Sequence, residues 1–305
     1  MRILVTGASG LLGLNLALEA TKEHTVFGQV NSHAIQTQEF QTLAADLLAP
    51  GAIENLLDRT QPDWVIHCAA LAVLDACEAD PARARQLNSE VPRKLAGYVA
   101  RGGARLLYVS TDAVFDGQRG GYSEEDAPNP LSVYARTKLE GERAVAKANP
   151  QALIARVNLF GWSLTGKRSL AEFFFYNLQA GNPLRGFTDV YFCPLLVNDL
   201  TYLFLRMLGL GLSGLYHTVS SQCLSKYDFG VALARRFGLN ESLISPTSIE
   251  AAGMKAARSP RLTLRSDKLA RALGGDLPTV STGLERFYTL YQQGYPQKLK
   301  ALSKR

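Results

Sequence analysis

Short aliphatic segments alternate with longer amphipathic ones through the first half of the chain. The short segments are rich in branched aliphatic residues, as strands buried on both faces of a parallel sheet are. The longer segments carry apolar residues at helical spacing. The alternation predicts strands at Arg2–Thr6, Thr25–Val30, Asp63–Cys68, Arg105–Ser110 and Ala152–Val157, and helices at Gly10–Thr21, Ala52–Thr60, Ser89–Arg101 and Ser132–Ala148. With right-handed crossovers these elements form a doubly wound α/β sheet.

The alternation breaks down after about residue 158. Segments punctuated by Gly and Pro follow, with one further strand expected at Gly214–Val219. A helix at Val197–Leu208 is expected to return the chain to the sheet. We therefore predict a first domain over residues 1–160, with return segments near 197–220, and a smaller C-terminal region over residues 161–305.

Composition and charge are those of an ordinary globular protein. The 305 residues are 47% hydrophobic and 20% charged, which suits one large domain or two closely joined ones. The net charge of +6 favours anionic ligands, but Lys and Arg are scattered, so no nucleic-acid partner is expected. The most apolar run, Leu200 to Leu215, contains Arg206 and three glycines, which indicates a buried helix and turn and no membrane contact.

Residues with redox or metal chemistry are dispersed. The four cysteines show no C-x-x-C spacing and the start of the sequence lacks the features of a secretory leader. These observations predict a cytoplasmic protein with reduced thiols. The four histidines are too far apart for a local ligand cluster, so no metal site is expected, and His67 on its apolar strand is expected to be a satisfied core residue.

A glycine-rich turn, Gly7-Ala8-Ser9-Gly10-Leu11-Leu12-Gly13, joins the first predicted strand to the first predicted helix. Glycine at such a turn permits a positive φ and lets backbone N–H groups approach a pyrophosphate, to which the helix N-terminus adds a partial positive charge. Glycine at the third position lets the helix pack closely on the strand. The turn predicts a Rossmann-type dinucleotide site whose cofactor-binding residues are Gly7, Ser9, Gly10, Leu11, Leu12 and Gly13.

No charge that would select the cofactor stands at the end of the second predicted strand. An NAD site usually carries an acidic residue there, whereas this chain continues Gln29-Val30-Asn31-Ser32-His33. Without a carboxylate to repel a 2′-phosphate, NADP(H) is the preferred cofactor and NAD(H) stays possible. Asn31, Ser32 and His33 offer hydrogen bonds to that phosphate, although each also fits a solvated loop.

Tyr134 and Lys138 are four residues apart in a predicted helix, so both side chains project from one face. The ammonium of Lys138 is expected to lower the pKa of Tyr134 and make it an acid near neutrality. The preceding strand ends in Ser110-Thr111-Asp112, and ligands of doubly wound folds bind beyond the carboxyl ends of strands. Thr111 is therefore expected to present its hydroxyl to the same reacting oxygen.

The order and spacing of these features resemble an extended short-chain dehydrogenase/reductase. The chain is similar to the dTDP-4-dehydrorhamnose reductase (RmlD-like) family over roughly residues 1–293, most clearly at Ser110–Gly117, Pro128–Glu142, Gly214–His217 and Arg258–Pro260. The resemblance implies transfer of hydride from NAD(P)H to the C4 ketone of a nucleotide-linked 4-keto-6-deoxy sugar. It also implies that the C-terminal region is mainly substrate-binding.

The resemblance assigns roles to single residues. Tyr134 would protonate the forming C4 alkoxide, Thr111 would hydrogen-bond the same oxygen, and Lys138 would hold the nicotinamide ribose. Asn88 would support the site from behind, although a helix N-cap explains it equally well. Asp46 is placed like the acid that contacts adenine and also fits an N-cap. The remaining residues expected at the cofactor are Leu47, Ala69, Ala70 and Leu71.

A small-molecule nucleotide sugar is the expected partner, and an exposed helix such as Ser132–Ala148 would permit a homodimer. Asp112 and Phe115, beyond the catalytic strand, are expected substrate contacts. Arg258 is the candidate for the diphosphate, because its guanidinium presents a fork of donors.

Alternative functions stay open. Sugar-nucleotide 4,6-dehydratases resemble this chain but carry an acidic residue directly after the Thr-Asp pair, where Ala113 stands here. Epimerases need no such carboxylate and share the tyrosine and the lysine, so an epimerase is an open alternative. RmlD-like chains also serve as NADP-binding regulatory subunits, similar to the non-catalytic subunit of methionine adenosyltransferase, but an intact Thr111, Tyr134 and Lys138 favour an enzyme. The residues after Ala70, Leu71 to Val73, are apolar where the rhamnose enzyme has a more polar loop. An apolar wall there would remove hydrogen-bond donors from the pocket, so the identity of the sugar stays open.

Overall fold

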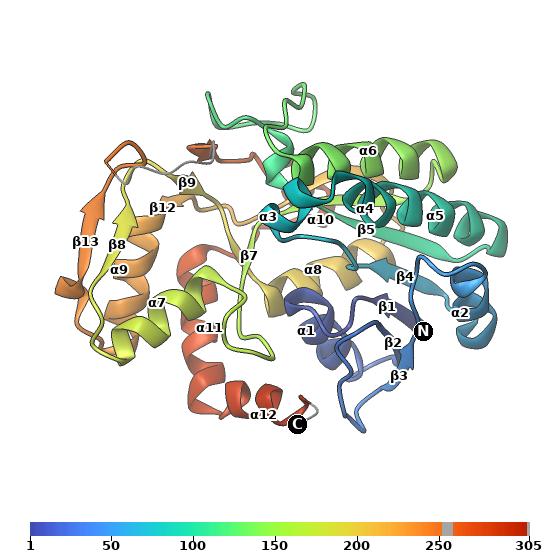
Figure 1. Cartoon of the computed structure of the whole chain (residues 1–305), viewed down its shortest axis with the longest axis horizontal. Coiled ribbons are helices and arrows are strands. Elements are labelled where there is room, and N and C mark those ends of the chain that lie inside the picture. The colour runs from blue at the N-terminus through green and yellow to red at the C-terminus, as the bar shows by residue number, and fades with distance from the viewer. Residues whose placement is uncertain (252–258, 304–305) are drawn as a thin grey trace.

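A seven-stranded parallel sheet forms the centre of the computed structural model, which describes residues 1–251 and 259–303 (Figure 1). All neighbouring strands in it are parallel. In spatial order the strands are β11 (Gly214–Thr218), β6 (Leu153–Val157), β5 (Arg105–Thr111), β4 (Trp64–His67), β1 (Arg2–Thr6), β2 (Thr25–Val30) and β3 (Gln41–Ala44). The order reverses between β1 and β4, where doubly wound sheets bind their ligands.

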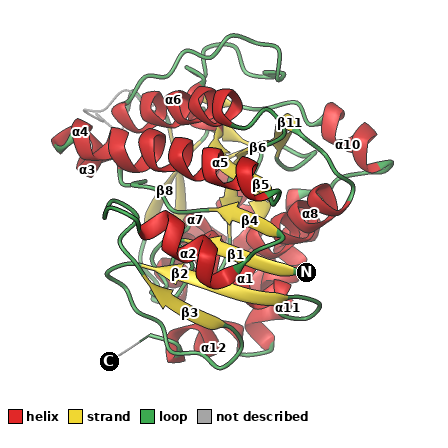
Figure 2. Ribbon diagram, turned by 90° about the vertical axis from the view of Figure 1, so that its right-hand side faces the viewer, coloured by secondary structure: helices red, strands yellow, loops and turns green. Residues whose placement is uncertain are grey.

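Helices cover both faces of this sheet (Figure 2). One face packs against α1 (Leu11–Ala20) and α8 (Val197–Gly209), and the other against α2 (Ala52–Thr60), α5 (Val91–Gly102) and α6 (Val133–Ala148). Successive strand residues divide between the two faces because side chains alternate along a strand. Ile3 and Val5 join the first core cluster, whereas Leu4 joins the second.

Most elements of the first half were predicted correctly, with shifts of one or two residues at their ends. Asp80 caps the short helix α4 (Pro81–Arg85), where its Oδ1 accepts a hydrogen bond from Arg83 N at 2.9 Å. The predicted helix Ser89–Arg101 begins later, because Gln86–Glu90 form a π-helical turn between α4 and α5. Strand β3 was not predicted.

The C-terminal region consists of helices and very short strand pairs. Its larger helices are α7 (Leu170–Gln179), α9 (Lys226–Phe237) and α11 (Val280–Gln292). Its strands are β7 (Leu159–Phe160) with β10 (Leu195–Leu196), β8 (Leu184–Phe187) with β13 (Ile244–Thr247), and β9 (Tyr191–Phe192) between β12 (Leu224–Ser225) and β14 (Arg261–Leu262). The remaining helices are α3 (Leu74–Ala79), α10 (Asp267–Leu273), α12 (Tyr295–Ala301) and the 3-10 turns Asp112–Val114 and Glu241–Leu243.

The run Leu200–Leu215 forms most of α8, a turn and the start of β11. Among the helices of residues 1–251 and 259–303, none is long and apolar enough to cross a membrane.

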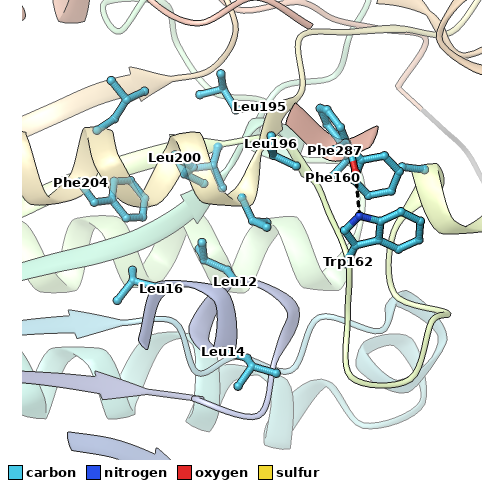
Figure 3. Close-up of a cluster of buried hydrophobic side chains, with 14 of the residues drawn as sticks. Leu12, Leu14, Leu16, Phe160, Trp162, Leu195, Leu196, Leu200, Phe204 and Phe287 are labelled. Carbon is cyan, nitrogen blue, oxygen red and sulfur yellow. Dashed lines mark hydrogen bonds between the residues drawn. The ribbon is translucent and has the colours of Figure 1, made fainter. Parts of the chain in front are cut away.

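One continuous hydrophobic cluster joins the sheet to the C-terminal region (Figure 3). It extends from Leu12 and Leu16 of α1, through Leu200 of α8, to Trp162 and Phe287. The indole of Trp162 stacks on the Phe287 ring at a centroid distance of 3.9 Å, and its Nε1 donates to the Phe287 carbonyl at 3.0 Å. The two parts of the chain therefore share a core. The exact boundary between them stays a prediction.

Two cysteines differ from the expectation of reduced thiols. Cys193 and Cys223 form a disulfide, although 30 residues separate them. The antiparallel pairing of β9 with β12 brings their segments together, because Leu224 lies opposite Phe192. Spacing along the sequence could not reveal this pairing. It depends on how β9 and β12 align, and each of these strands is only two residues long. Cys68 and Cys77 are free thiols.

Candidate active site

The glycine-rich turn between β1 and α1 packs closely against the end of β4. Gly7 has a φ of +69°, and a Cβ on it would lie 2.9 Å from the Cα and N of Ala69. A Cβ on Gly13 would lie 2.3 Å from the carbonyl oxygen of Gly7. Gly10 is the N-cap of α1, and no side chain caps the first turn. The turn therefore presents backbone N–H groups at a helix start, which is the arrangement that binds a phosphate.

Gln29 on β2 fixes this turn to the sheet. Its Oε1 accepts from Gly7 N at 2.9 Å, and its Nε2 donates to the carbonyl of Ala45 at 2.7 Å. Because Gln29 is buried, these bonds also satisfy an amide that would otherwise be costly to bury. Gln29 therefore supports the turn structurally, a role that the sequence pattern did not indicate.

The loop after β2 begins with the exposed residues Asn31, Ser32 and His33. Ser32 Oγ lies 3.1 Å from Nδ1 of His33. Further along, Gln36 N donates to the carbonyl of Leu302 at 2.9 Å, so residues after α12 hold this loop. The polar groups expected at a 2′-phosphate are therefore accessible on a loop that is anchored at one end.

Asp46 is exposed at a turn that precedes α2. Its Oδ1 accepts from Leu48 N at 3.0 Å. Gly51, and not Asp46, is the N-cap of α2. The neighbouring Leu47 is buried in the core beneath α2, so its side chain faces away from solvent.

Asn88 connects the segment after β4 to α6. Its Oδ1 accepts from Leu71 N at 2.9 Å, and its Nδ2 donates to the Leu71 carbonyl at 3.0 Å and to Thr137 Oγ1 at 3.1 Å. Asn88 lies inside the π-helical turn and is therefore not an N-cap. The bonds hold the segment of Ala69, Ala70 and Leu71 in place behind the glycine turn and next to α6.

Helix α6 places Tyr134 and Lys138 on one face, as predicted. The helix begins after Ser132, whose Oγ accepts from Ala135 N at 3.2 Å. Lys138 is buried, donates from Nζ to the carbonyl of Val109 at 2.7 Å, and lies 4.0 Å from the centroid of the Tyr108 ring. The lysine is thereby fixed against β5.

The pKa values of this pair differ from the sequence-based expectation. Burial raises the pKa of Tyr134 to about 12, and the nearby Thr111 hydroxyl only partly opposes this shift. Burial lowers the pKa of Lys138 to about 7, although the negative charge of Glu142 opposes this shift. The expected lowering of the Tyr134 pKa is therefore wrong. Tyr134 keeps its proton on Oη across the ordinary pH range.

Thr111 lies between Tyr134 and a buried carboxylate. Its Oγ1 accepts from Ala113 N at 3.2 Å and donates to Asp112 Oδ1 at 3.2 Å, and its hydroxyl is near enough to Tyr134 to lower the pKa of that phenol. Asp112 is 4% exposed and accepts from Asn158 Nδ2 at its other oxygen. Burial raises the pKa of Asp112 to about 6, opposed by its bonds to Asn158 and Thr111 and by the charge of Lys226.

A cavity of about 260 Å³ opens beside this carboxylate. Its polar lining includes Ser132, Asn158 and Lys226, and its apolar lining includes Phe192 and Leu262. Residues that closely follow β5 and β6, the N-cap residue of α6 and residues of the C-terminal region thus meet there. A cleft with a few polar groups in an apolar wall is typical of a small-molecule site.

The predicted substrate contacts divide into three cases. Asp112 lies at the site. Phe115 is fully buried, with its ring stacked on Tyr122 at 4.2 Å and Arg156 5.0 Å from its centroid, so it belongs to the core and not to the surface of the cleft. Arg258 lies outside the described residues, but the adjacent Ser259 lines the cavity.

Asn158 and Lys226 were missed by the sequence analysis. Asn158 directly follows β6 and could have been found by the rule that singled out Thr111 at the end of β5, the neighbouring strand. Lys226 begins α9, after the strand pattern has broken down, and no local signal marks it.

His67 is only partly satisfied in the core. Its Nδ1 lies 2.7 Å from Thr6 Oγ1, but its buried Nε2 has no hydrogen-bond partner among residues 1–251 and 259–303. Burial, with the charge of Lys138 added, lowers its pKa to about 3, so the ring is neutral.

The fold and this site together define an extended short-chain dehydrogenase/reductase with a Rossmann-like core. The chain belongs to the RmlD substrate binding domain family, whose model matches residues 1–293.

Solved structures and curated relatives agree with this membership. A dTDP-4-dehydrorhamnose reductase from Clostridium acetobutylicum is 26% identical, with a TM-score of 0.81 over 96% of this chain and 100% of that chain. A dTDP-4-dehydrorhamnose reductase from Bacillus anthracis, solved in complex with NADP, is 25% identical, with a TM-score of 0.80 over 94% of this chain and 98% of that chain.

Two curated relatives carry different names. The probable low-salt glycan biosynthesis reductase Agl14 of Haloferax volcanii is 32% identical over 93% of this chain and 96% of its own length. Methionine adenosyltransferase 2 subunit beta of Bos taurus is 33% identical over 86% of this chain and 80% of its own length. The relatives of this chain therefore include proteins with reductase names and proteins named as a subunit of another enzyme.

Proposed function

We propose that this chain reduces the C4 ketone of a nucleotide-linked 4-keto-6-deoxy sugar with a reduced nicotinamide cofactor. The observation that carries the proposal is the placement of Tyr134 and Lys138 on one face of α6, with Lys138 bonded to the Val109 carbonyl of β5 and Tyr134 near Thr111 at the carboxyl end of that strand. A cavity large enough for part of a sugar nucleotide lies beside it. Relatives named as reductases support the same reaction class.

The glycine turn fits a dinucleotide. A Cβ on Gly7 would clash with the backbone of Ala69, and a Cβ on Gly13 would clash with the carbonyl of Gly7. The close approach of this turn to the start of α1 therefore requires glycine at both positions. Gly7, Ser9, Gly10 and Leu11 would hold the pyrophosphate, while Leu12 packs into the core. The bound cofactor supplies hydride. Asp46 would contact the adenine, and Ala69 to Leu71 would line the path of the cofactor.

NADP(H) is the proposed cofactor in preference to NAD(H). The end of β2 has no carboxylate, and Gln29 at this place is engaged by Gly7 and Ala45. Asn31 and Ser32 are exposed and can donate hydrogen bonds to a 2′-phosphate. The Bacillus anthracis relative was solved with NADP.

Each side chain at the site would act on the ketone or on the sugar that carries it. Tyr134 donates its Oη proton to the carbonyl oxygen as negative charge develops there. Thr111 hydrogen-bonds the same oxygen. Lys138 lies one helical turn from the phenolate that forms, and its charged form, which burial disfavours and Glu142 favours, would stabilise that phenolate. The buried carboxylate of Asp112 would face the sugar from the cavity side.

A non-catalytic regulatory role is the second candidate. Its support is the similarity to methionine adenosyltransferase 2 subunit beta, which is as close in identity as the reductase relative. An epimerase is a third candidate, since it would need the same Tyr134 and Lys138. Neither alternative explains better than a reductase why Thr111 and Tyr134 lie close together near a cavity bordered by Ala113 and Ser132.

The test is oxidation of NADPH and NADH by the purified protein, followed by the absorbance of reduced nicotinamide. The substrates are dTDP-4-keto-6-deoxyglucose generated in situ and other nucleotide-linked keto sugars. Turnover with formation of a C4 hydroxyl supports the proposal, and the ratio of the two rates decides the cofactor. Tight cofactor binding without turnover on any keto sugar would favour the regulatory role.

A further inference from the structure

Lys138 is an ammonium group buried against β5. It is 2% exposed, its Nζ donates to the Val109 carbonyl at 2.7 Å, and Nζ lies over the Tyr108 ring at 4.0 Å from the centroid. Glu142, one turn further along α6, accepts from Arg156 with both carboxylate oxygens, at 2.9 and 2.8 Å. A buried cation is costly unless neighbouring groups compensate its charge. Within residues 1–251 and 259–303, the direct contacts of Nζ are therefore a neutral carbonyl and an aromatic face.

The ring of Tyr108 is fixed by two contacts of its own. Its Oη donates to the backbone carbonyl of Asn88 at 2.9 Å, and Asn88 belongs to the π-helical turn Gln86–Glu90. The ring also stacks on His67, with a centroid distance of 5.9 Å and an angle of 18° between the ring planes. Both contacts restrict the side-chain torsions of Tyr108, which is fully buried. The ring therefore stays in place beneath Nζ.

Gly141 lets α6 come close to this ring. A Cβ on Gly141 would lie 2.4 Å from Tyr108 Oη and 2.2 Å from the Asn88 carbonyl oxygen, so a side chain there would push α6 away from β5. Positions three apart on a helix share a face, so Gly141 and Lys138 both face β5. The short distance between Nζ and the ring thus depends on the lack of a side chain almost one turn further along α6.

We propose that Tyr108 is a positioning residue whose ring keeps the ammonium of Lys138 charged and in place for the reduction. The inference rests on the proposed ketoreductase function, in which Lys138 stabilises the phenolate that forms on Tyr134. The face of an aromatic ring carries the negative part of its quadrupole and attracts a cation that lies over it, most strongly where water is excluded. The Val109 carbonyl fixes the position of Nζ, and the Tyr108 ring favours its charge.

The charge of Lys138 needs this support near neutral pH. Burial lowers the pKa of Lys138 to about 7, and Glu142 opposes the shift. Cys68 and His67 also face Lys138, but burial raises the pKa of the thiol to about 12 and lowers that of the imidazole to about 3, so both are neutral. Tyr134, one turn earlier on α6, keeps its proton as well. The positive charge thus depends on a carboxylate that is already ion-paired and on the ring beneath Nζ.

A magnetic resonance titration of the cofactor-free protein tests the contact without any turnover. Lysine side chains labelled with carbon-13 are followed through pH, and Lys138→Met identifies the signal of Lys138. In the wild type this signal should titrate below those of the exposed lysines. Tyr108→Phe keeps the aromatic face and should leave the midpoint nearly unchanged. Tyr108→Leu should lower the midpoint by about one pH unit, because the ammonium loses its favourable contact while the neutral amine loses little.

Fluorinated rings separate charge from shape, and they keep the test decisive if Tyr108→Leu does not fold. Phenylalanine analogues with one, two or three ring fluorines at position 108 pack much as Phe does, but each fluorine withdraws electron density from the ring face. The midpoint of Lys138 should therefore fall with each fluorine added. An unchanged midpoint across this series, or a rise of the midpoint in Tyr108→Leu, would overturn the proposal.

The pH profile of turnover connects the contact to the reaction. Only the charged form of Lys138 stabilises the phenolate, so activity is lost as pH rises through the pKa of Lys138. In Tyr108→Leu this loss should begin about one pH unit lower, so kcat falls about tenfold above both midpoints and only a few-fold below them. The KM for the keto sugar should change little, and Tyr108→Phe should keep the wild-type profile.

Phe204→Leu is the matched control, because Phe204 is a fully buried aromatic residue of α8. It should lose stability as Tyr108→Leu does, but keep the wild-type pH profile and the midpoint of Lys138. A loss of kcat in Tyr108→Leu that is equal at every pH would mean that Tyr108 acts through packing alone, and the proposal would fail. If the wild type turns over no keto sugar, the proposed function fails, and the magnetic resonance titration alone decides whether Tyr108 supports the charge of Lys138.

Discussion

Glu142 and Arg156 form a two-bond ion pair in the interior, one helical turn beyond Lys138. Arg156 Nε donates to Oε1 at 2.9 Å and Nη2 to Oε2 at 2.8 Å, and both side chains are buried. Ser110 Oγ, next to Thr111 on β5, donates to the same carboxylate at 2.5 Å. The pair thus ties α6, which carries Tyr134, to β5 and β6.

Removing either partner of this pair leaves a buried charge alone. Glu142→Gln and Arg156→Met should each lower the free energy of unfolding by about 3–5 kcal/mol. The double variant should lose clearly less than the sum, because neither charge is left unpaired. Urea denaturation of the three variants measures these differences. The exposed pair Arg235 and Glu241 is the control, where the corresponding substitutions should have small and additive effects. Additive losses at Glu142 and Arg156 would show that the two charges do not depend on each other.

Tyr134→Phe tests the proton donor. The variant keeps the ring and loses only the Oη proton, so turnover should fall by about 10²-fold or more while cofactor affinity stays within a few-fold. Steady-state rates and a fluorescence titration with NADPH measure the two quantities. Tyr202→Phe on the exposed face of α8 should change neither. Equal activity of Tyr134→Phe and the wild type would remove Tyr134 from the mechanism.

Ser32→Asp tests the choice of cofactor. A carboxylate on the loop after β2 would repel a 2′-phosphate, so affinity for NADPH should fall about tenfold or more, while affinity for NADH should stay the same or improve. Gln36→Asp adds the same charge further along the exposed loop and should have a smaller effect. Calorimetric binding with both cofactors measures the ratio. A parallel loss for both cofactors would mean that Ser32 does not lie near the phosphate.

Comparison of Gly7→Ala with Gly51→Ala separates two effects of replacing glycine: the strain of a positive φ and the clash of the added methyl group with neighbouring atoms. Both glycines have a positive φ, of +69° and +73°, so alanine at either is strained by roughly 1–2 kcal/mol. Only at Gly7 would the added methyl meet backbone atoms, at 2.9 Å from Ala69, whereas Gly51 has open space. Gly7→Ala should therefore destabilise the protein more than Gly51→Ala and should also abolish dinucleotide binding. Denaturation curves and NADPH titration of the two variants make the comparison, and equal behaviour would contradict the role of the turn.

The sequence could predict the elements that rest on a strong local pattern. Strand β1, the glycine turn and α6 with Tyr134 and Lys138 were all placed correctly, because apolar period and spacing determine them locally. Strand β3 was missed because Gln41–Ala44 has a single large aliphatic residue and pairs only at the sheet edge.

The remaining parts of the site depend on contacts that no local pattern encodes. Gln29 and Asn88 act through hydrogen bonds to residues 16 to 49 positions away. Phe115 was expected at the substrate by its place in a motif, but the chain turns it into the core. The pKa of Tyr134 follows burial, which spacing along a helix cannot reveal.

The contacts of α12 bear on how the protein emerges from the ribosome. Tyr295 donates to Asn15 Oδ1 at 2.9 Å across 280 positions of sequence, Leu299 is fully buried, and Leu302 receives the hydrogen bond of Gln36 N. The first helix and the loop after β2 thus lack part of their packing until the segment around residues 295–302 has left the exit tunnel. Folding of the dinucleotide half during synthesis therefore stays incomplete until this segment has left the tunnel, and in a nascent chain stalled earlier Asn15 Oδ1 lacks the hydrogen bond from Tyr295.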